Sequence, residues 1–119
     1  METSVPGLNV LTQMLDAAAL RHRVIAQNVA NVNTPGYKRR EVVFETDLAK
    51  ALAAPDGAAT AHVEPKIVLS EDGPERVDGN NVDIDREMNE MTKNSLLYQA
   101  AAQIIASRVA SMRAAIAGR

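Results

Sequence analysis

Apolar residues near the start of the chain recur in alternating steps of three and four positions. This spacing is the heptad pattern of an α-helix that lays one apolar stripe against a partner helix. It predicts a helix over residues 8–32, roughly 35 Å long at a rise of about 1.5 Å per residue. We expect Asn9 to be its N-cap, and His22 interrupts the stripe. The stripe is a predicted assembly seam and consists of Leu8, Leu11, Leu15, Ala18, Ile25, Val29 and Val32.

This first predicted helix meets a stop signal in the stretch "IAQNVANVNTPGYKRR". Pro35 lacks an amide hydrogen and biases the residue before it away from helical backbone angles. Gly36 accepts a positive φ, so residues 34–37 are predicted to form a type II turn. We expect the turn to lead the chain out of the helical layer. The helix-exit turn is assigned to Asn31, Asn33, Thr34, Pro35, Gly36 and Tyr37.

A second heptad pattern near the other end of the chain is the longest regular pattern in the sequence. It predicts a helix of about 33 residues, on the order of 50 Å long, with Asp83 as its N-cap. Its predicted assembly seam consists of Ile84, Met88, Met91, Tyr98, Ala102, Ile105, Val109, Met112 and Ile116. A second packing stripe is formed by Leu97, Ala101 and Ile104. One partner helix cannot cover both stripes, so we expect several neighbours around this helix.

The segment between the two helices has weaker patterns. "YKRREVVFE" predicts a short extended piece, and "LAKALAAPDGAATAH" predicts a frayed helical turn followed by a flexible linker. Residues 63–69 form one β-like run, bounded by turn residues. A small hairpin and disorder both remain open for this run.

These patterns predict an all-α fold in which two long terminal helices form an antiparallel, coiled-coil-like pair. The expected segments are residues 1–36, the extended and flexible residues 37–81, and the helical residues 82–119. Only 3% of the residues are aromatic, so few side chains supply large buried areas. Since ordering the backbone costs about 1–2 kcal/mol per residue, we expect a partly disordered monomer that gains helix on assembly.

Composition and charge narrow the classes of function. The formal charge of −2 argues against nucleic-acid binding, and no apolar run is long enough to span a membrane. The chain has no cysteine, and neither His22 nor the acidic residues between positions 71 and 87 show the spacing of a metal site. We therefore expect no catalytic, cofactor-binding or metal-binding residues, and no enzymatic activity.

Two groups of polar residues lie around the predicted turn. Asn28, Asn31 and Asn33 are interpreted as helix-end residues. The cationic residues 38–40 are expected to form a solvated patch, with contact to acidic groups of a neighbour as the alternative.

Two stretches resemble a known family. "IAQNVANVNTPGYKRREVVF" is similar to the N-terminal signature of bacterial flagellar rod and hook proteins, in which Ala-Asn at the end of a helix is followed by Asn-Thr-Pro-Gly-Tyr. "NNVDIDREMNEMTKNSLLYQA" resembles the members that build the proximal rod, whose short length this chain shares. The matches cover the two terminal parts of the chain and leave out residues 46–78.

The resemblance implies a structural subunit of the flagellar basal body that polymerises through its terminal helices into a torque-transmitting tube. The implied partners are other copies of itself, other proximal rod proteins, the adaptor FliE, the MS ring and the flagellar export gate. The resemblance raises a second interpretation of Asn28, Asn31 and Asn33, in which their amides form hydrogen bonds to neighbouring subunits, and both interpretations remain open. It also implies export by the flagellar type III apparatus without signal cleavage. Residues 1–7 fit that route because they lack the basic and apolar regions of a cleavable signal.

The heptads alone are also typical of a cytoplasmic coiled-coil adaptor or signalling module, which remains one alternative. A neighbouring proximal rod paralogue is the other alternative, because the resemblance does not exclude it. A membrane-surface helix is disfavoured because the chain has few aromatic anchors.

Overall fold

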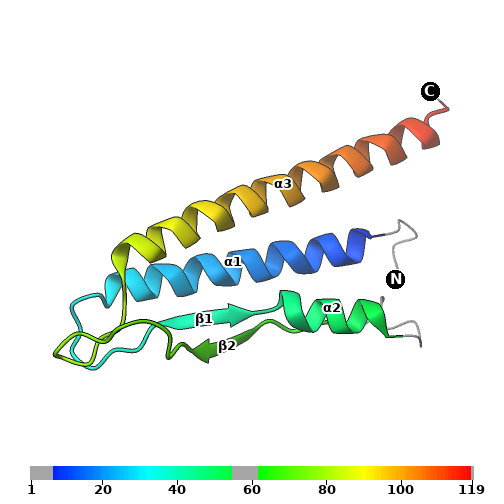
Figure 1. Cartoon of the computed structure of the whole chain (residues 1–119). Helices are drawn as coiled ribbons and strands as arrows, with labels where there is room; N and C mark the ends of the chain where they lie inside the picture. The colour runs from blue at the N-terminus through cyan, green and yellow to red at the C-terminus, as the bar shows by residue number, and fades with distance from the viewer. Residues whose placement is uncertain (1–6, 55–61, 119) are drawn as a thin grey trace.

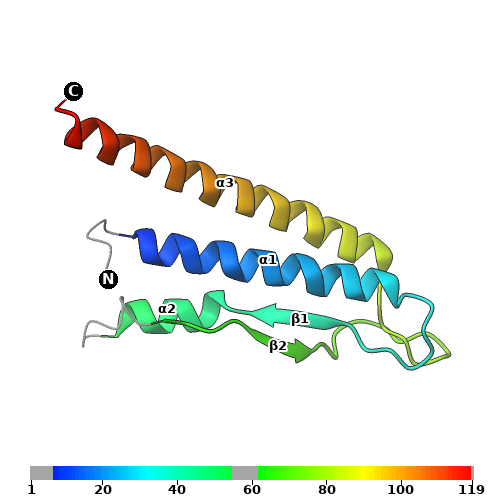
Figure 2. The ribbon, with the colours of Figure 1, turned by 180° about the vertical axis from the view of Figure 1, so that it is seen from behind.

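The protein is an elongated molecule of 64 × 32 × 19 Å in which two long helices and a small sheet are arranged in layers (Figure 1). The computed structural model describes residues 7–54 and 62–118. α1 lies between α3 on one side and the sheet with α2 on the other, as the view from behind also shows (Figure 2). In chain order the elements are α1 (Leu8–Ala30), β1 (Arg40–Val43), α2 (Glu45–Ala53), β2 (Lys66–Leu69) and α3 (Ile84–Ile116).

The predicted pair of long terminal helices is confirmed. α1 and α3 run antiparallel, with Asn28 near the end of α1 bonded to Glu87 near the start of α3. α1 ends at Ala30, slightly before the predicted boundary. The predicted N-cap was wrong, because Asn9 lies within the first helical turn and Gly7 occupies the cap position with φ 79°. Glycine takes this left-handed conformation without the steric cost that a β-carbon brings.

α3 has the predicted start and length. It spans 33 residues, and the Oδ1 atom of Asp83 accepts hydrogen bonds from the N–H groups of Asp85 at 3.0 Å and Arg86 at 3.4 Å. These donors would otherwise lack partners, since the first N–H groups of a helix have no carbonyl one turn earlier. Asp83 is therefore a true N-cap.

Replacing Asp83 by alanine should lower the free energy of unfolding by about 1 kcal/mol, the usual value for a lost N-cap. Urea denaturation followed by circular dichroism measures this change. Asp83→Asn is the matched control, because its side-chain oxygen can still accept both hydrogen bonds. An equal loss in both variants would contradict the capping role.

The middle of the chain is more regular than the sequence pattern suggests. β1 and β2 form a two-stranded antiparallel sheet, with Arg40 opposite Leu69 and Val43 opposite Lys66. The frayed turn expected at the start of residues 48–62 is instead part of the nine-residue helix α2, which begins earlier, at Glu45. Acidic residues in its first turn and Lys50 in its last turn suit the helix dipole. The remainder of the predicted linker, residues 55–61, lies outside the described residues.

The main hydrophobic core lies between α1 and this middle segment. Ala17 and Val24 of α1 pack with Val42 and Phe44, and all four side chains are buried. Partly buried apolar side chains surround this group, namely Met14, Leu20, Leu48 and Val63. α1 therefore has two packing faces, and the interface with α3 is only one of them.

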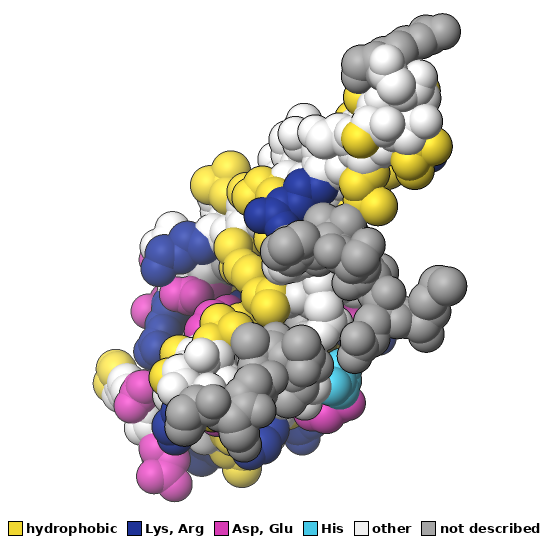
Figure 3. Space-filling view, turned by 90° about the vertical axis from the view of Figure 1, so that its right-hand side faces the viewer, with side chains coloured by type: hydrophobic (Ala, Val, Ile, Leu, Met, Phe, Trp, Pro, Cys, Tyr) yellow, Lys and Arg dark blue, Asp and Glu magenta, His cyan; other side chains and the backbone are white. Residues whose placement is uncertain are grey.

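α3 extends past the described start of α1. A β-carbon at Gly7 would lie 2.9 Å from Nη1 of Arg108, so the first residue described before α1 is level with Arg108. The rest of α3 projects beyond this point and diverges from α1 (Figures 1 and 2). Seen from the end where the termini lie, this projecting part carries hydrophobic side chains and few charges (Figure 3). Ile116, near its end, is 84% exposed.

A candidate assembly surface and the corner that supports it

The predicted helix-exit turn is present at the corner between α1 and β1. Gly36 has φ 74°, and the N–H of Tyr37 donates to the carbonyl of Thr34 at 3.2 Å, as expected for a type II turn. The N–H of Gly36 also donates to the carbonyl of Asp78 at 2.8 Å. This turn therefore contacts the loop that enters α3.

Gly36→Val should destabilise the corner by about 1–2 kcal/mol, because a β-branched residue is strained at positive φ. A β-carbon at this position would meet nothing within 4 Å, so the backbone alone accounts for the cost. Urea denaturation gives the change in stability, and swimming of cells carrying the variant tests its effect on assembly. Gly36→Asn is the control, since asparagine tolerates this conformation better. Equal stability of the two variants would exclude backbone strain.

Asn28 joins three elements at the corner. Its side chain is fully buried, and its Nδ2 donates to the carbonyl of Arg40 at 2.9 Å and to Oε2 of Glu87 at 3.1 Å. Its Oδ1 accepts from the N–H of Arg40 at 2.9 Å and from the hydroxyl of Tyr37 at 3.2 Å. The side-chain amide of Asn28 therefore forms its hydrogen bonds to residues of the same chain.

The other two asparagines differ from Asn28. Asn31 donates from Nδ2 to the carbonyl of Gln27 at 2.8 Å and accepts from the hydroxyl of Thr34 at 3.0 Å, which makes it a helix-end residue. Asn33 is exposed in the turn. Of the three, only Asn33 has an exposed side chain.

The expectation of a solvated cationic patch at residues 38–40 was wrong for its central residue. Nε of Arg39 donates to Oε1 of Glu87 at 2.7 Å, and the two side chains are 5% and 0% exposed. Arg39 also pairs with Glu41. It points inward because side chains alternate in direction along extended backbone. Glu87, in the first turn of α3, is its buried partner.

The electrostatics of this pair favour the charged form of the arginine. Burial acts to lower the pKa of Arg39, but its hydrogen bonds to Glu87 and Glu41, together with their charges, raise the pKa above its ordinary value. Arg39 is therefore held in its charged form, and the two carboxylates compensate its charge.

Asn80 and Asn81, which the sequence analysis gave no role, complete the corner. Nδ2 of Asn80 donates to the carbonyls of Asn31 at 2.9 Å and Thr34 at 2.8 Å, beyond the end of α1. Asn81 accepts from the N–H of Arg39 at 2.6 Å and donates to the carbonyl of Ser70 at 2.7 Å. The backbone carbonyls just beyond the end of α1 thus accept hydrogen bonds from side chains. The two adjacent asparagines were a visible signal of such a role.

The buried edge of α3 shares only Ala101 with the predicted second packing stripe and no residue with the predicted seam. Glu87, Asn94 and Ala101 are its buried residues and lie one heptad apart. Asn94 donates from Nδ2 to the carbonyl of Ala18 at 2.8 Å. The heptad pattern does not reveal Glu87 and Asn94 as edge residues, because both are polar and a heptad is recognised by its apolar positions.

The predicted seam residues are distributed around this edge. On α1, Ala18 and Ile25 are buried, and the partly buried seam residues are Leu8, Leu11, Leu15, Val29 and Val32. On α3, the partly buried positions are Met91, Leu97, Ala102, Ile105 and Val109. The exposed positions are Ile84, Met88, Tyr98, Ile104, Met112 and Ile116. The uncovered apolar positions therefore run the whole length of α3.

The described residues include no group of three or more His, Cys, Asp or Glu side chains that could hold a metal ion. Within the same ranges, no helix combines the length and apolar character needed to cross a membrane. His22 is exposed on α1 and, with Tyr98 of α3, lines a groove of about 550 Å³ between the helices.

α1 and its exit turn are similar to a known protein family. A family model described as "Flagella basal body rod protein" matches residues 8–38, which contain α1 and the exit turn. The class is thus that of structural proteins of the flagellar rod.

Proteins that are similar over nearly the whole chain narrow this class to one family. Flagellar basal body rod protein FlgB of Bacillus subtilis is 32% identical over 117 residues, covering 91% of each chain. FlgB of Borrelia hermsii is 32% identical, covering 92% of this chain and 95% of its own. FlgB of Escherichia coli is 31% identical, covering 89% of each. The chain belongs to the FlgB family of flagellar basal body rod proteins.

Proposed function

We propose that this protein is a proximal rod subunit that polymerises through its two terminal helices into a tube and transmits torque. The observation that carries the proposal is the uncovered surface of α3. Between Lys93 and Arg108 this helix has no charged side chain, yet Leu96 is 62% and Ile104 is 44% exposed. Exposed apolar surface of this extent is typical of interaction sites.

The corner supports this role because it fixes the direction in which α3 leaves the rest of the molecule. The ion pair of Arg39 with Glu87 and the amide of Asn28 join α1, β1 and α3 at one point. Neighbouring subunits can then meet α3 in a defined orientation. Side chains such as Ala100, Ala110 and Ala114 permit close approach of neighbouring helices.

The partners in this proposal are other copies of the chain, other proximal rod proteins, the adaptor FliE, the MS ring and the export gate. The protein would leave the cytoplasm through the flagellar type III apparatus without cleavage of a signal. Family membership supports the basal-body location. The individual contacts and the export route are parts of the proposal.

Cell fractionation tests the location and the route together. Purified basal bodies from cells with a working flagellar export apparatus should contain the protein at its full length. Cells without that apparatus should retain it in the cytosol. Detection only in the cytosol of both strains would refute the proposal and favour the coiled-coil adaptor.

Circular dichroism at increasing protein concentration tests the polymerisation step. Helix content should rise as the exposed face of α3 becomes covered by other copies, since tertiary packing stabilises helices more than intrinsic propensity does. Full helicity with the same cooperative melting at every concentration would argue against it.

A further inference from the structure

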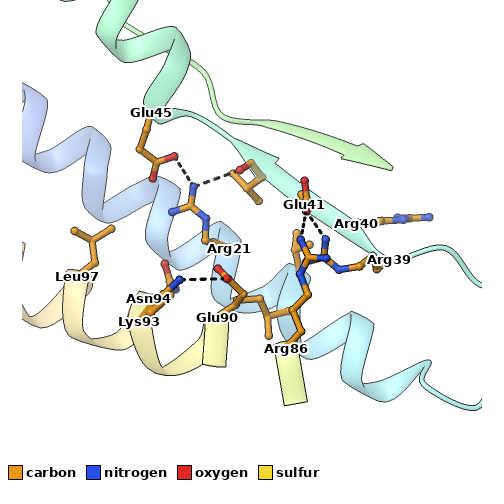
Figure 4. A pocket seen from close by; sticks show the side chains of 13 residues that line it. Arg21, Arg39, Arg40, Glu41, Glu45, Arg86, Glu90, Lys93, Asn94 and Leu97 are labelled. Atoms are coloured by element: carbon orange, nitrogen blue, oxygen red, sulfur yellow. Dashed lines mark hydrogen bonds and ion pairs between the residues drawn. The ribbon is translucent and has the colours of Figure 1, made fainter. Parts of the chain in front are cut away.

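A groove between α1, β1 and α3 carries an incompletely neutralised set of cations (Figure 4). It encloses a cavity of about 360 Å³ beside the C-terminal half of α1. The cationic side chains that line it are Arg21, Arg39, Arg40, Arg86 and Lys93, and the acidic ones are Glu41, Glu45 and Glu90.

The ion pairs in this groove leave three cations with weak or no partners. Arg21 bonds Glu45 at 2.7 Å, and Arg39 is neutralised by Glu87 and Glu41. Arg86 lies 3.4 Å from Glu41, a carboxylate that Arg39 already shares. Lys93 lies 3.6 Å from Glu90 and is 75% exposed.

Arg40 is the third of these cations. Among the described residues, no carboxylate lies within ion-pair distance of it. Its side chain extends along β1, away from Arg21 (Figure 4). The rim of the groove therefore has positive charge available for an acidic partner.

The same chain carries a complementary acidic loop at its corner end. Residues 71–78 join β2 to the asparagines of the corner, and all of them are exposed. This loop lies at the end of the molecule opposite the termini (Figures 1 and 2). Its acidic side chains are Glu71, Asp72, Glu75 and Asp78, with Arg76 as the one cation between them.

Part of this acidic charge is already used within the chain. Glu75 pairs with Lys38, and Oδ1 of Asp78 accepts from the N–H of Asn80 at 3.0 Å. Within the described ranges, no ion pair involves Glu71 or Asp72. These two carboxylates are available to a neighbour.

We infer that the acidic loop of one copy docks against the cationic groove of a second copy. The contact joins two different surfaces, so each copy that receives a loop still presents its own loop to the next. Such head-to-tail contacts generate open helical polymers when the rotation does not close a ring. The inference rests on the proposed polymerisation and adds to it a contact separate from the helix faces.

Two charge-reversed variants of the full chain test the contact. The loop variant is Glu71→Lys with Asp72→Lys, and the groove variant is Arg40→Glu with Lys93→Glu. Each alone should self-associate about tenfold more weakly in sedimentation velocity, because like charges then face each other. A mixture of the two should regain the wild-type association, since each variant's loop is complementary to the other's groove.

The matched control is Lys50→Glu with Glu64→Lys, which reverses exposed charges outside both surfaces. It should associate like the wild type. At a dilution at which no variant associates, circular dichroism should show the same helix content in the wild type and all variants. Wild-type association should also weaken with added salt, which screens exposed charges.

The outcomes separate this contact from the proposed function. If the wild type associates and both reversed variants associate equally well, the loop and groove do not meet, while polymerisation through the helices stands. If mixing fails to restore association lost in the single variants, the pairing is likewise refuted. If the wild type does not associate at any concentration, both proposals fail.

Discussion

Glu87→Ala should lower the free energy of unfolding by about 3–5 kcal/mol, as expected when one partner of a buried ion pair is removed. Arg39 would keep its buried charge, with Glu41 as its remaining partner. Asn28 would also lose an acceptor. Urea denaturation measures this loss of stability. The substitution should leave much of the protein unfolded at physiological temperature, because the free energy of unfolding of native proteins is small.

Two variants make this prediction specific. Glu90→Ala, which removes an acid paired to an exposed lysine, should cost less than about 1 kcal/mol. The double variant Arg39→Met with Glu87→Leu should recover part of the loss, since apolar residues of similar volume often replace a buried pair. A cost at Glu87 no greater than at Glu90 would show that the buried pair does not stabilise the corner.

Phe44→Ala should cost about 3–5 kcal/mol, the range for removing a large aromatic side chain from a packed core. Phe44 is 1% exposed and packs with Ala17, Val24 and Val42. It is the only phenylalanine in the chain, and no tryptophan is present to compensate. Because it attaches the middle segment to α1, hydrogen exchange should also accelerate in α2 and the sheet.

Leu52→Ala is the control for this prediction, because Leu52 lies on α2 but is 46% exposed. Its cost should stay below that of Phe44→Ala by at least about 1.5 kcal/mol, since burial scales with the area removed from water. If the two variants are equally stable, the middle segment does not pack against α1 in solution as it does in the structure.

The features that the sequence predicted well are those set by neighbouring residues. The heptads specify both long helices, Asp83 caps α3, and Pro35 with Gly36 sets the exit turn. Each depends on backbone preferences or on contacts within a few positions, which can be read from a short stretch.

The corner network could not be predicted in this way. Arg39 and Glu87 are distant in sequence, and only the folded topology places them together in a site shielded from water. A cation beside other cations is most often solvated, so the local pattern favoured the wrong environment. The second packing face of α1 was missed for a related reason. Ala17 and Val24 lie beside the expected stripe on α1, and Phe44, which packs on them, lies between β1 and α2.

The projecting part of α3 has a mechanical consequence. Hydrogen bonds of Glu87 and Asn94 hold the N-terminal half of α3 against α1, and the side chains of α3 become more exposed toward Ile116. A helix held at one end moves most at its free end and least near the held end. In the proposed assembly, copies in slightly different surroundings would therefore adjust this end of α3 while the corner keeps its geometry, so one amino-acid sequence could occupy non-equivalent positions.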